Sequence, residues 1–385
     1  MTTPVKKRRT AFIHCPELES FSYPPDCPFN SSRAGRTRKI LASMGLLTGP
    51  GRSEVAPQPA TRERILTFHS PSYLDALIAA ESGHLDVEGL RMGIGTEDCP
   101  VFKGLVAYAS LAAGATMKAA EVILAGEADV AFNPSGGYHH AGPSKASGFC
   151  YINDVVLACK KLVAVGKRVV FLDIDVHHGD GVQWAFYDSP DVMTISLHES
   201  GKTLFPWGGF EEEVGDGDGL GYCANVPLPP GTTDSAFLRA LDAVAIPLIR
   251  AYNPDVIVLE MGMDMLAADP LAHLNLTNNA YCDAIERILA CRRPLLAVGG
   301  GGYNVENTAR GWALAWTVFC GEDGGWSDMS LGLGGVMLGT SEWQGGLRDP
   351  EQVPDPAIQA EVDRAVDETI RKVKLNVFPY HGLTD

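Results

Sequence analysis

Acidic and imidazole side chains are concentrated in one short run of this 385-residue chain. The run, Asp173-Ile-Asp-Val-His-His178, follows the apolar stretch Val169-Val-Phe-Leu172. Carboxylates are costly to bury unless their charge is neutralised, and a divalent metal does this directly. A catalytic zinc takes about three nitrogen or oxygen ligands and leaves one position open. We therefore predict a zinc site with Asp175, His177 and Asp264 as ligands, although iron(II) or cobalt also suits this donor set.

The same run has a structural interpretation. An aspartate at a strand end often caps the next helix or pairs with a buried arginine. Two aspartates and two histidines in one run, with Asp264 beyond a second apolar stretch, favour the metal site over this alternative.

Two further groups of residues have chemistry to offer. His139-His140 follow Ser135-Gly-Gly-Tyr138, and Tyr303 follows four consecutive glycines, 299–302. A histidine pair alone is ambiguous, because histidines near a core are more often structural than catalytic. Glycines allow the backbone to approach a ligand closely. The glycine run lacks the GxGxxG spacing of a dinucleotide site, so a nucleotide is disfavoured.

Short apolar runs and helix-length stretches must position these side chains. The runs end in polar or Gly-rich loops, which is typical of buried parallel strands. Their alternation with helices predicts an α/β protein with a mostly parallel sheet and helices on both faces. The predicted strands are 10–14, 130–133, 169–175, 192–197, 255–259 and 294–298, and the predicted helices include 102–126, 152–165, 234–252, 278–291 and 305–318.

The predicted sheet would bring the reactive residues together. In an open parallel sheet, ligands bind beyond the carboxyl ends of the strands, and the histidine pair, the acidic run, Asp264 and Tyr303 all follow predicted strands. We predict one catalytic domain, residues 1–320, and a C-terminal extension, residues 321–385, that packs on the same domain and carries a helix over 356–373.

The composition is that of a globular protein, with 45% hydrophobic and 20% charged residues. A net charge of −16 argues against nucleic-acid binding as the main task, and the longest apolar runs are too short for a membrane span. The first residues lack the apolar core of a secretory signal, and nine cysteines without CxxC pairs indicate reduced thiols. We therefore expect a cytoplasmic location, with the basic run Lys6-Lys-Arg-Arg9 as a lead-in to the first strand rather than a nuclear address.

Several motifs together resemble the zinc-dependent histone deacetylase family. They are Gly137-Tyr-His-His-Ala141, Ala146-Ser-Gly-Phe-Cys-Tyr-Ile-Asn-Asp154, Asp173-Ile-Asp-Val-His-His-Gly-Asp-Gly181, Val192-Met-Thr-Ile-Ser-Leu-His198 and Gly299-Gly-Gly-Gly-Tyr-Asn304. The resemblance runs from about Ser22 to Cys320 and looks closest to the class I enzymes and their bacterial relatives, including acetoin-utilisation proteins. It implies a single-domain arginase-like fold, with a parallel sheet of roughly eight strands.

The resemblance implies roles for matching residues. Asp175, His177 and Asp264 would be the zinc ligands. His140 would act as general base and acid, and Tyr303 would stabilise the oxyanion. The full set of implied catalytic residues is His139, His140, Asp173, Asp180 and Tyr303, in which Asp173 orients His139 and Asp180 holds His140.

A narrow acyl-lysine channel is also implied. Its substrate-binding residues would be Asp98, Gly148, Phe149, Phe205, Leu271 and Gly301, and an acetate exit would run past Arg33 and Gly300. Composition alone would equally allow Phe149 and Phe205 to be ordinary core residues. A structural potassium ion would be held by Asp173, Asp175, His177, Ser196 and Leu197.

The function that these observations favour is removal of acetyl, or longer acyl, groups from the ε-amine of lysine in proteins or peptides. A close alternative is deacetylation of small amines such as acetylpolyamines. More distant alternatives are a manganese ureohydrolase with two catalytic metals and a catalytically silent acyl-lysine binding protein. The basic tail of nuclear members is missing, so a chromatin role is unsupported. The sequence gives no indication of the oligomeric state.

Overall fold

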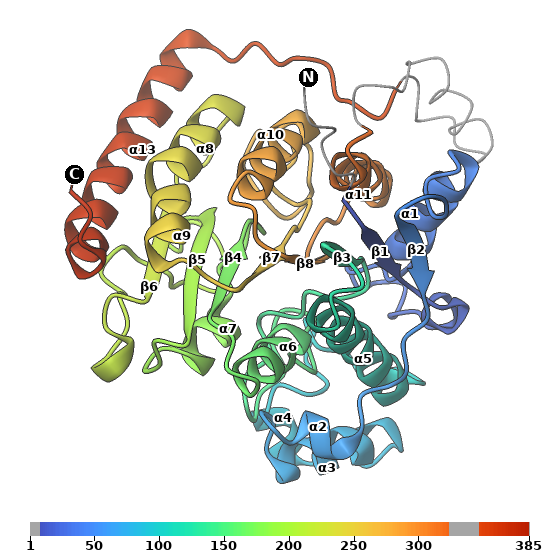
Figure 1. The fold of residues 1–385 in the computed structure, drawn as a ribbon. Coiled ribbons are helices and arrows are strands. Elements are labelled where there is room, and N and C mark those ends of the chain that lie inside the picture. The colour runs from blue at the N-terminus through green and yellow to red at the C-terminus, as the bar shows by residue number, and fades with distance from the viewer. Residues whose placement is uncertain (1–7, 323–345, 385) are drawn as a thin grey trace.

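Eight parallel strands form one sheet at the centre of the computed structural model, which describes residues 8–322 and 346–384. The strand order is β2-β1-β3-β8-β7-β4-β5-β6, and every ladder is parallel (Figure 1). The strands are β1 (Thr10–Ile13), β2 (Arg52–Val55), β3 (Val130–Asn133), β4 (Val169–Asp173), β5 (Val192–Glu199), β6 (Cys223–Leu228), β7 (Val256–Glu260) and β8 (Leu295–Val298).

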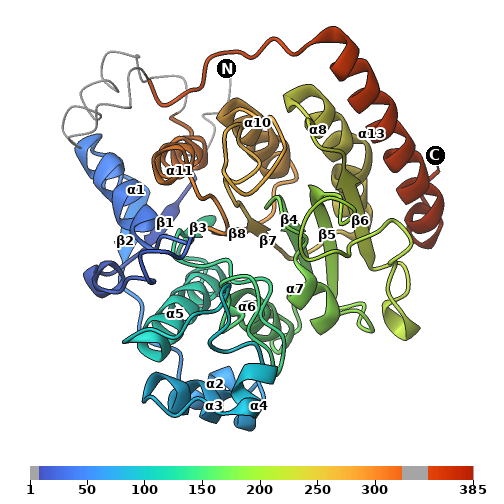
Figure 2. The same cartoon turned by 180° about the vertical axis from the view of Figure 1, so that it is seen from behind.

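Helices cover both faces of this sheet, as the two opposite views show (Figures 1 and 2). One face carries α1 (Ser32–Ser43), α8 (Asp234–Ala240), α9 (Ile246–Tyr252), α10 (Asn278–Leu289) and α11 (Val305–Cys320), and α13 (Pro356–Val377) runs beside the edge strand β6. The other face carries α5 (Leu105–Leu124), α6 (Asp154–Val163) and α7 (Asp180–Ala185). Beyond these lie α2 (Arg62–Ile65), α3 (Pro71–Glu81) and α4 (Val87–Arg91). Short helices are η1 (Pro16–Ser20), η2 (Gly217–Gly219), η3 (Leu241–Ala245) and η4 (Phe378–His381).

The predicted fold class, a parallel α/β sheet with helices on both faces, is confirmed. Six of the eight strands are at the predicted places, whereas β2 and β6 were missed. Both missed strands lie at the edges of the sheet. An edge strand needs no continuous apolar run: β2 reads Arg-Ser-Glu-Val, and β6 contains Pro227, which a sheet tolerates at an edge.

The helix predicted over 234–252 differs in its middle. The structure has α8 and α9 joined by one turn of π-helix, η3. Pro247 has no amide hydrogen, and its ring crowds the carbonyl four residues earlier, so a wider turn accommodates it. The helix predicted over 356–373 extends to Val377 as α13, and α1 and α3 were not predicted.

The C-terminal helix α13 packs against β6 and α8. The division of the chain at residue 320 stays a prediction. Part of the basic run that begins at Lys6, and most of the stretch that follows Cys320, lie outside the described residues. Within residues 8–322 and 346–384, none of the helices combines the length and apolar character that a membrane crossing requires.

Aromatic side chains fill the core between the sheet and α11. Trp316 is fully buried, and its indole nitrogen donates to the Leu46 carbonyl oxygen at 2.9 Å. Its ring packs edge-on against Phe12 of β1, with centroids 5.3 Å apart. This packing fixes α11 over β1 and β3, and so places the loop between β8 and α11 that carries Tyr303.

We predict that Trp316→Ala lowers the free energy of unfolding by about 3–5 kcal/mol, because it leaves a large cavity and an unpaired carbonyl. Trp184→Ala is the matched control: this tryptophan is 58% exposed, and its loss should cost less than about 1 kcal/mol. Urea unfolding followed by circular dichroism measures both. Equal losses for the two variants would contradict the proposed importance of this contact.

Candidate active site

Asp175, His177 and Asp264 come together at the carboxyl edge of the central strands, and all three are buried. Asp175 and His177 follow β4, and Asp264 lies four residues beyond β7, the neighbouring strand. The Nδ1 atom of His177 lies 3.2 Å from Oδ1 of Asp175 and 3.1 Å from Oδ2 of Asp264. The structure thus places side by side the three donors that the sequence predicted to converge.

The geometry of these three residues fits a divalent metal. Zinc bonds of about 2.0–2.1 Å in a tetrahedral arrangement put neighbouring ligand atoms about 3.3 Å apart, close to the separations seen here. Although burial lowers the pKa of His177, its hydrogen bonds to Asp175 and Asp264 raise that pKa to about 10. Burial and the Asp175 carboxylate raise the pKa of Asp264 to about 7. A bound dication would neutralise the negative charge of Asp175 and Asp264, which the proton on His177 otherwise neutralises.

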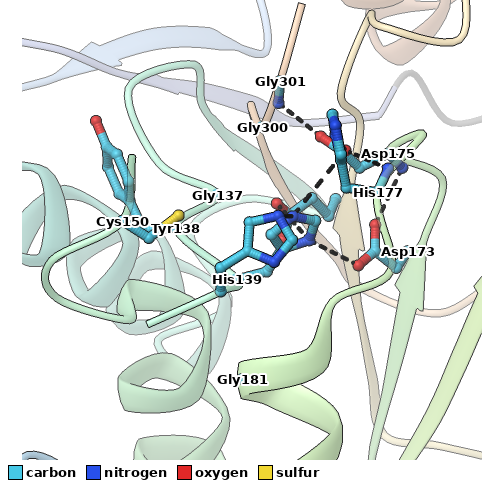
Figure 3. A network of polar contacts seen from close by, with 12 residues as sticks. Gly137, Tyr138, His139, Cys150, Asp173, Asp175, His177, Gly181, Gly300 and Gly301 are labelled. Atoms are coloured by element: carbon cyan, nitrogen blue, oxygen red, sulfur yellow. Dashed lines mark hydrogen bonds and ion pairs between the residues drawn. The ribbon is translucent and has the colours of Figure 1, made fainter. Parts of the chain in front are cut away.

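Backbone amides hold the two carboxylates in place. Gly301 donates its amide to Oδ2 of Asp175 at 2.6 Å, as Figure 3 shows, and Val176 donates to Oδ1 of Asp264 at 3.0 Å. An added Cβ on Gly301 would stand 1.9 Å from Oδ2 of Asp264. The glycine run after β8 is therefore required for close approach of backbone to the ligands.

His139 and His140 lie beside this cluster with their rings turned toward each other. Their Nε2 atoms are 3.0 Å apart, and His139 Nε2 is 4.0 Å from Oδ1 of Asp175. The Nδ1 atoms face carboxylates: His139 contacts Asp173 at 2.9 Å, and His140 contacts Asp180 at 2.8 Å. Burial and His139 lower the pKa of His140 to about 4, so this imidazole is neutral at pH 7 and able to accept a proton.

Asn153 and Asp154, at the start of α6, hold the loop of the histidine pair. Asp154 is fully buried and accepts the amides of Gly137 and Tyr138, at 3.0 and 2.8 Å, while the Asn153 amide group donates to the His139 and Ala141 carbonyl oxygens. Both residues were quoted in a motif but given no role. Their importance was not visible in the sequence, because it rests on contacts to backbone atoms.

Glu260 is a buried carboxyl group that the sequence interpretation missed. It ends β7 opposite Asp173 of β4, and Oε1 lies 3.1 Å from Nδ1 of His139. His139, Asp173 and Glu260 form a second buried group whose ligand atoms converge. Burial and the neighbouring Asp173 raise the pKa of Glu260 well above its usual value. A single glutamate that follows an apolar strand has no spacing pattern to reveal it.

Aromatic rings surround the ligand cluster. Phe205 packs on His140 and His177, with centroids 5.0 and 6.3 Å away, and Tyr303 lies 6.1 Å from His177 and 5.7 Å from Phe149. A Cβ on Gly148 would meet both His140 and Phe205. His140, Phe205 and Tyr303 therefore lie next to His177, and Phe149 lies next to Tyr303.

The other expected residues lie in two neighbouring places. Asp98 accepts the Gly148 amide at 3.0 Å, and a cavity of about 480 Å³ beside it is lined by Asp26, Cys27, Pro28, Glu97, Asp98, Pro100 and Phe149. Leu271 is partly exposed in the loop after β7. Arg33 is buried, donates to the Gly300 and Gly302 carbonyl oxygens, and stacks on Phe29 with its guanidinium carbon 4.4 Å from the ring centroid.

Ser196 and Leu197 are buried in β5, and Ser196 is the register partner of Asp173 in β4. The Ser196 hydroxyl contacts Nδ1 of His198 at 2.7 Å. The residues expected around potassium are thus adjacent in the sheet, and potassium itself stays a prediction.

The fold and this site define an α/β protein whose parallel sheet presents a buried carboxylate and imidazole cluster suited to a metal. Residues 27–319 match the histone deacetylase domain. Histone deacetylase 2 of Oryza sativa subsp. japonica is 38% identical over 320 residues, 83% of this chain and 63% of that protein. Acetoin utilization protein AcuC of Bacillus subtilis (strain 168) is 39% identical over 327 residues, 83% of this chain and 84% of that protein.

Solved structures give the same result. An HDAC homologue complexed with SAHA superposes with a TM-score of 0.84 at 33% identity, covering 96% of this chain and 100% of that chain. The chain belongs to the histone deacetylase family. It spans less than two thirds of the length of two rice relatives, 63% of Histone deacetylase 2 and 62% of Histone deacetylase 3.

The close packing of the ligands gives a prediction for Gly262. A Cβ at this position would stand 1.9 Å from Oδ2 of Asp175 and 2.8 Å from Oδ1 of Asp264, so Gly262→Ala should displace a carboxylate and bind much less than one zinc per chain. Gly142→Ala is the control, because its Cβ would meet Lys145 at an ordinary 3.6 Å. Metal analysis after dialysis against zinc measures both, and full occupancy of a folded Gly262→Ala would refute the ligand assignment.

Proposed function

We propose that this chain is a metal-dependent amidohydrolase that removes acetyl groups from the ε-amine of lysine in proteins or peptides. The observation that carries the proposal is the convergence of Asp175, His177 and Asp264 beside a neutral His140 and the Tyr303 phenol. Membership of the histone deacetylase family supports the same reaction.

Asp175, His177 and Asp264 would hold the metal, which we propose to be zinc, with iron(II) or cobalt also suited to these donors. When bound, such a metal polarises an amide carbonyl and acidifies water. We also propose a structural potassium ion at Asp173, Asp175, His177, Ser196 and Leu197.

The chain's own residues divide the remaining work. His140 accepts a proton from the attacking water at Nε2, because its Nδ1 is held by Asp180, and returns a proton to the leaving amine. His139, oriented by Asp173, supplies electrostatic support next to it. Tyr303 donates its hydroxyl to the carbonyl oxygen as negative charge develops there.

Substrate binding is assigned to the rings and the rim. Phe149 and Phe205 would enclose the apolar stem of acyl-lysine, with Gly148 leaving room between His140 and Phe205. Asp98 and Leu271 would meet the substrate at the rim, and Gly301 would line the floor. Arg33 would draw acetate into the interior beside Gly300, because its guanidinium is buried there.

A small acetylated amine, such as an acetylpolyamine, is the second candidate substrate. The cavity at the rim carries three carboxylates, Asp26, Glu97 and Asp98, next to Phe149. A concentration of negative charge attracts a cationic chain as well as it attracts basic residues that flank an acetyl-lysine.

The test is hydrolysis by purified protein that has been stripped of metal and reloaded with zinc, iron(II) or cobalt. We expect free amine from an acetyl-lysine peptide, compared side by side with longer acyl-lysine peptides and acetylspermidine. Asp175→Ala should lose both stoichiometric metal and turnover. If loaded protein binds acyl-lysine but hydrolyses no acyl-amine, the chain is a binding protein; two catalytic metals per chain would favour a ureohydrolase.

Tyr303→Phe should retain metal but lose turnover about 10²- to 10³-fold, because the oxyanion loses one donor. The phenyl ring remains, so substrate binding should change little. Steady-state kinetics with metal analysis on the same sample checks this, and unchanged kcat would show that Tyr303 is not the oxyanion donor.

A further inference from the structure

Two buried carboxylates outside the ligand cluster hold the loops that form the channel. The loops follow β5, β7 and β8, and they carry Phe205, Leu271 and Tyr303 respectively. Residues 269–273, which we name the connecting segment, lie in the loop after β7. One of the two carboxylates, Asp269, is at the start of this segment, and the other, Glu199, contacts its end.

Asp269 fixes the backbone of the proposed oxyanion donor. Its Oδ2 accepts the Tyr303 amide at 2.7 Å, its Oδ1 accepts the Leu271 amide at 3.0 Å, and the residue is 8% exposed. Tyr303 follows four glycines, and glycines by themselves restrict the backbone conformation very little. Arg33 and Asp175 hold the glycines themselves. The Asp269 contact therefore sets the direction in which the Tyr303 side chain leaves the loop.

Glu199 fixes the other end of the connecting segment. This residue ends β5 and is 1% exposed. Its carboxylate accepts the His273 amide at 2.9 Å and the His273 Nδ1–H at 2.8 Å, and it also accepts the Thr203 hydroxyl at 3.0 Å. Thr203 lies two residues before Phe205. One carboxylate thus joins the loop of Phe205 to the segment that carries Leu271.

We propose that Asp269 and Glu199 are positioning residues for deacylation: Asp269 aims the Tyr303 hydroxyl, and Glu199 keeps the connecting segment, and with it Asp269, in register with the Phe205 loop. The proposal rests on the proposed function, because it assigns a purpose to the aim of Tyr303. A carboxylate that accepts two backbone amides is pre-organised, and small displacements of a catalytic group are costly in rate.

The test compares kinetics in two backgrounds. Asp269→Asn retains size but replaces one acceptor by a donor, so kcat should fall about 10- to 100-fold with KM and metal content nearly unchanged. In a Tyr303→Phe background the same substitution should cost less than about threefold, because no hydroxyl remains to be aimed. Equal losses in both backgrounds, or an unchanged kcat, would overturn the role of Asp269.

Asp234→Asn is the matched control. Asp234 also accepts a backbone amide from the loop after β7, that of Thr277 at 2.7 Å, but it has no contact with Tyr303. Its loss should lower the Tm, leave kcat within about twofold, and act equally in both backgrounds.

Amide exchange separates this inference from the proposed function. The Tyr303 amide should exchange faster in Asp269→Asn than in wild type or Asp234→Asn, whether or not the protein hydrolyses any acyl-amine. Unchanged exchange would overturn the inference even in an active enzyme. Glu199→Gln should reduce kcat in the same direction as Asp269→Asn, and the double variant should lose little beyond the larger single loss; additive losses would refute a shared connecting segment.

Discussion

Buried negative charge at the ends of β4 and β7 is the constraint on which the rest of the site depends. Asp173, Asp175, Glu260 and Asp264 are each at most 1% exposed. In a medium of low polarity, such carboxylates repel one another strongly and lose most of their hydration. They remain buried because imidazoles, backbone amides and, as we propose, cations compensate them. The histidines thus stabilise the buried carboxylates in addition to the catalytic roles that we propose for them.

Compensation by amides explains why glycines surround the cluster. An amide reaches a buried carboxylate only if no side chain stands in the way, and a Cβ on Gly301 or Gly262 would overlap the ligand carboxylates. The same principle works at a distance from the metal ligands: Asp154 collects the amides that precede His139, and Asp269 collects the amide of Tyr303. The loop that carries the histidine pair and the loop that carries Tyr303 are therefore each held by backbone amides that donate to a buried carboxylate.

The difference between residues that follow the strands and carboxylates that bind backbone amides explains what was predictable from the sequence. Once the strands are parallel, the residues that follow them must meet at one edge of the sheet, so the convergence of Asp175, His177 and Asp264 was predictable from residue type and spacing. The family resemblance supplied the expected places of His140 and Tyr303. Asp154, Glu199, Asp269 and Glu260 were missed, because their partners are backbone atoms or a histidine far along the chain. The edge strands β2 and β6 were missed because neither contains a continuous apolar run: β2 reads Arg-Ser-Glu-Val, and β6 is interrupted by Asn225 and Pro227.

The floor and the rim of the proposed acyl-lysine channel are held by different forces, and this bears on the proposed specificity. At the floor, fully buried charges tolerate few arrangements, so the chemistry of the site is narrowly determined. At the proposed rim, Asp98, Glu97 and Leu271 are partly or fully exposed, and solvent screens the charges of the two carboxylates. We therefore expect substitutions there to change which amine is admitted without displacing the three proposed metal ligands. The connecting segment links the two levels, since Asp269 accepts the amides of both Tyr303 and Leu271, the residue that we propose for the rim. For the proposed function, a change of acyl preference and a change of turnover are therefore expected to be coupled through the five residues of this segment.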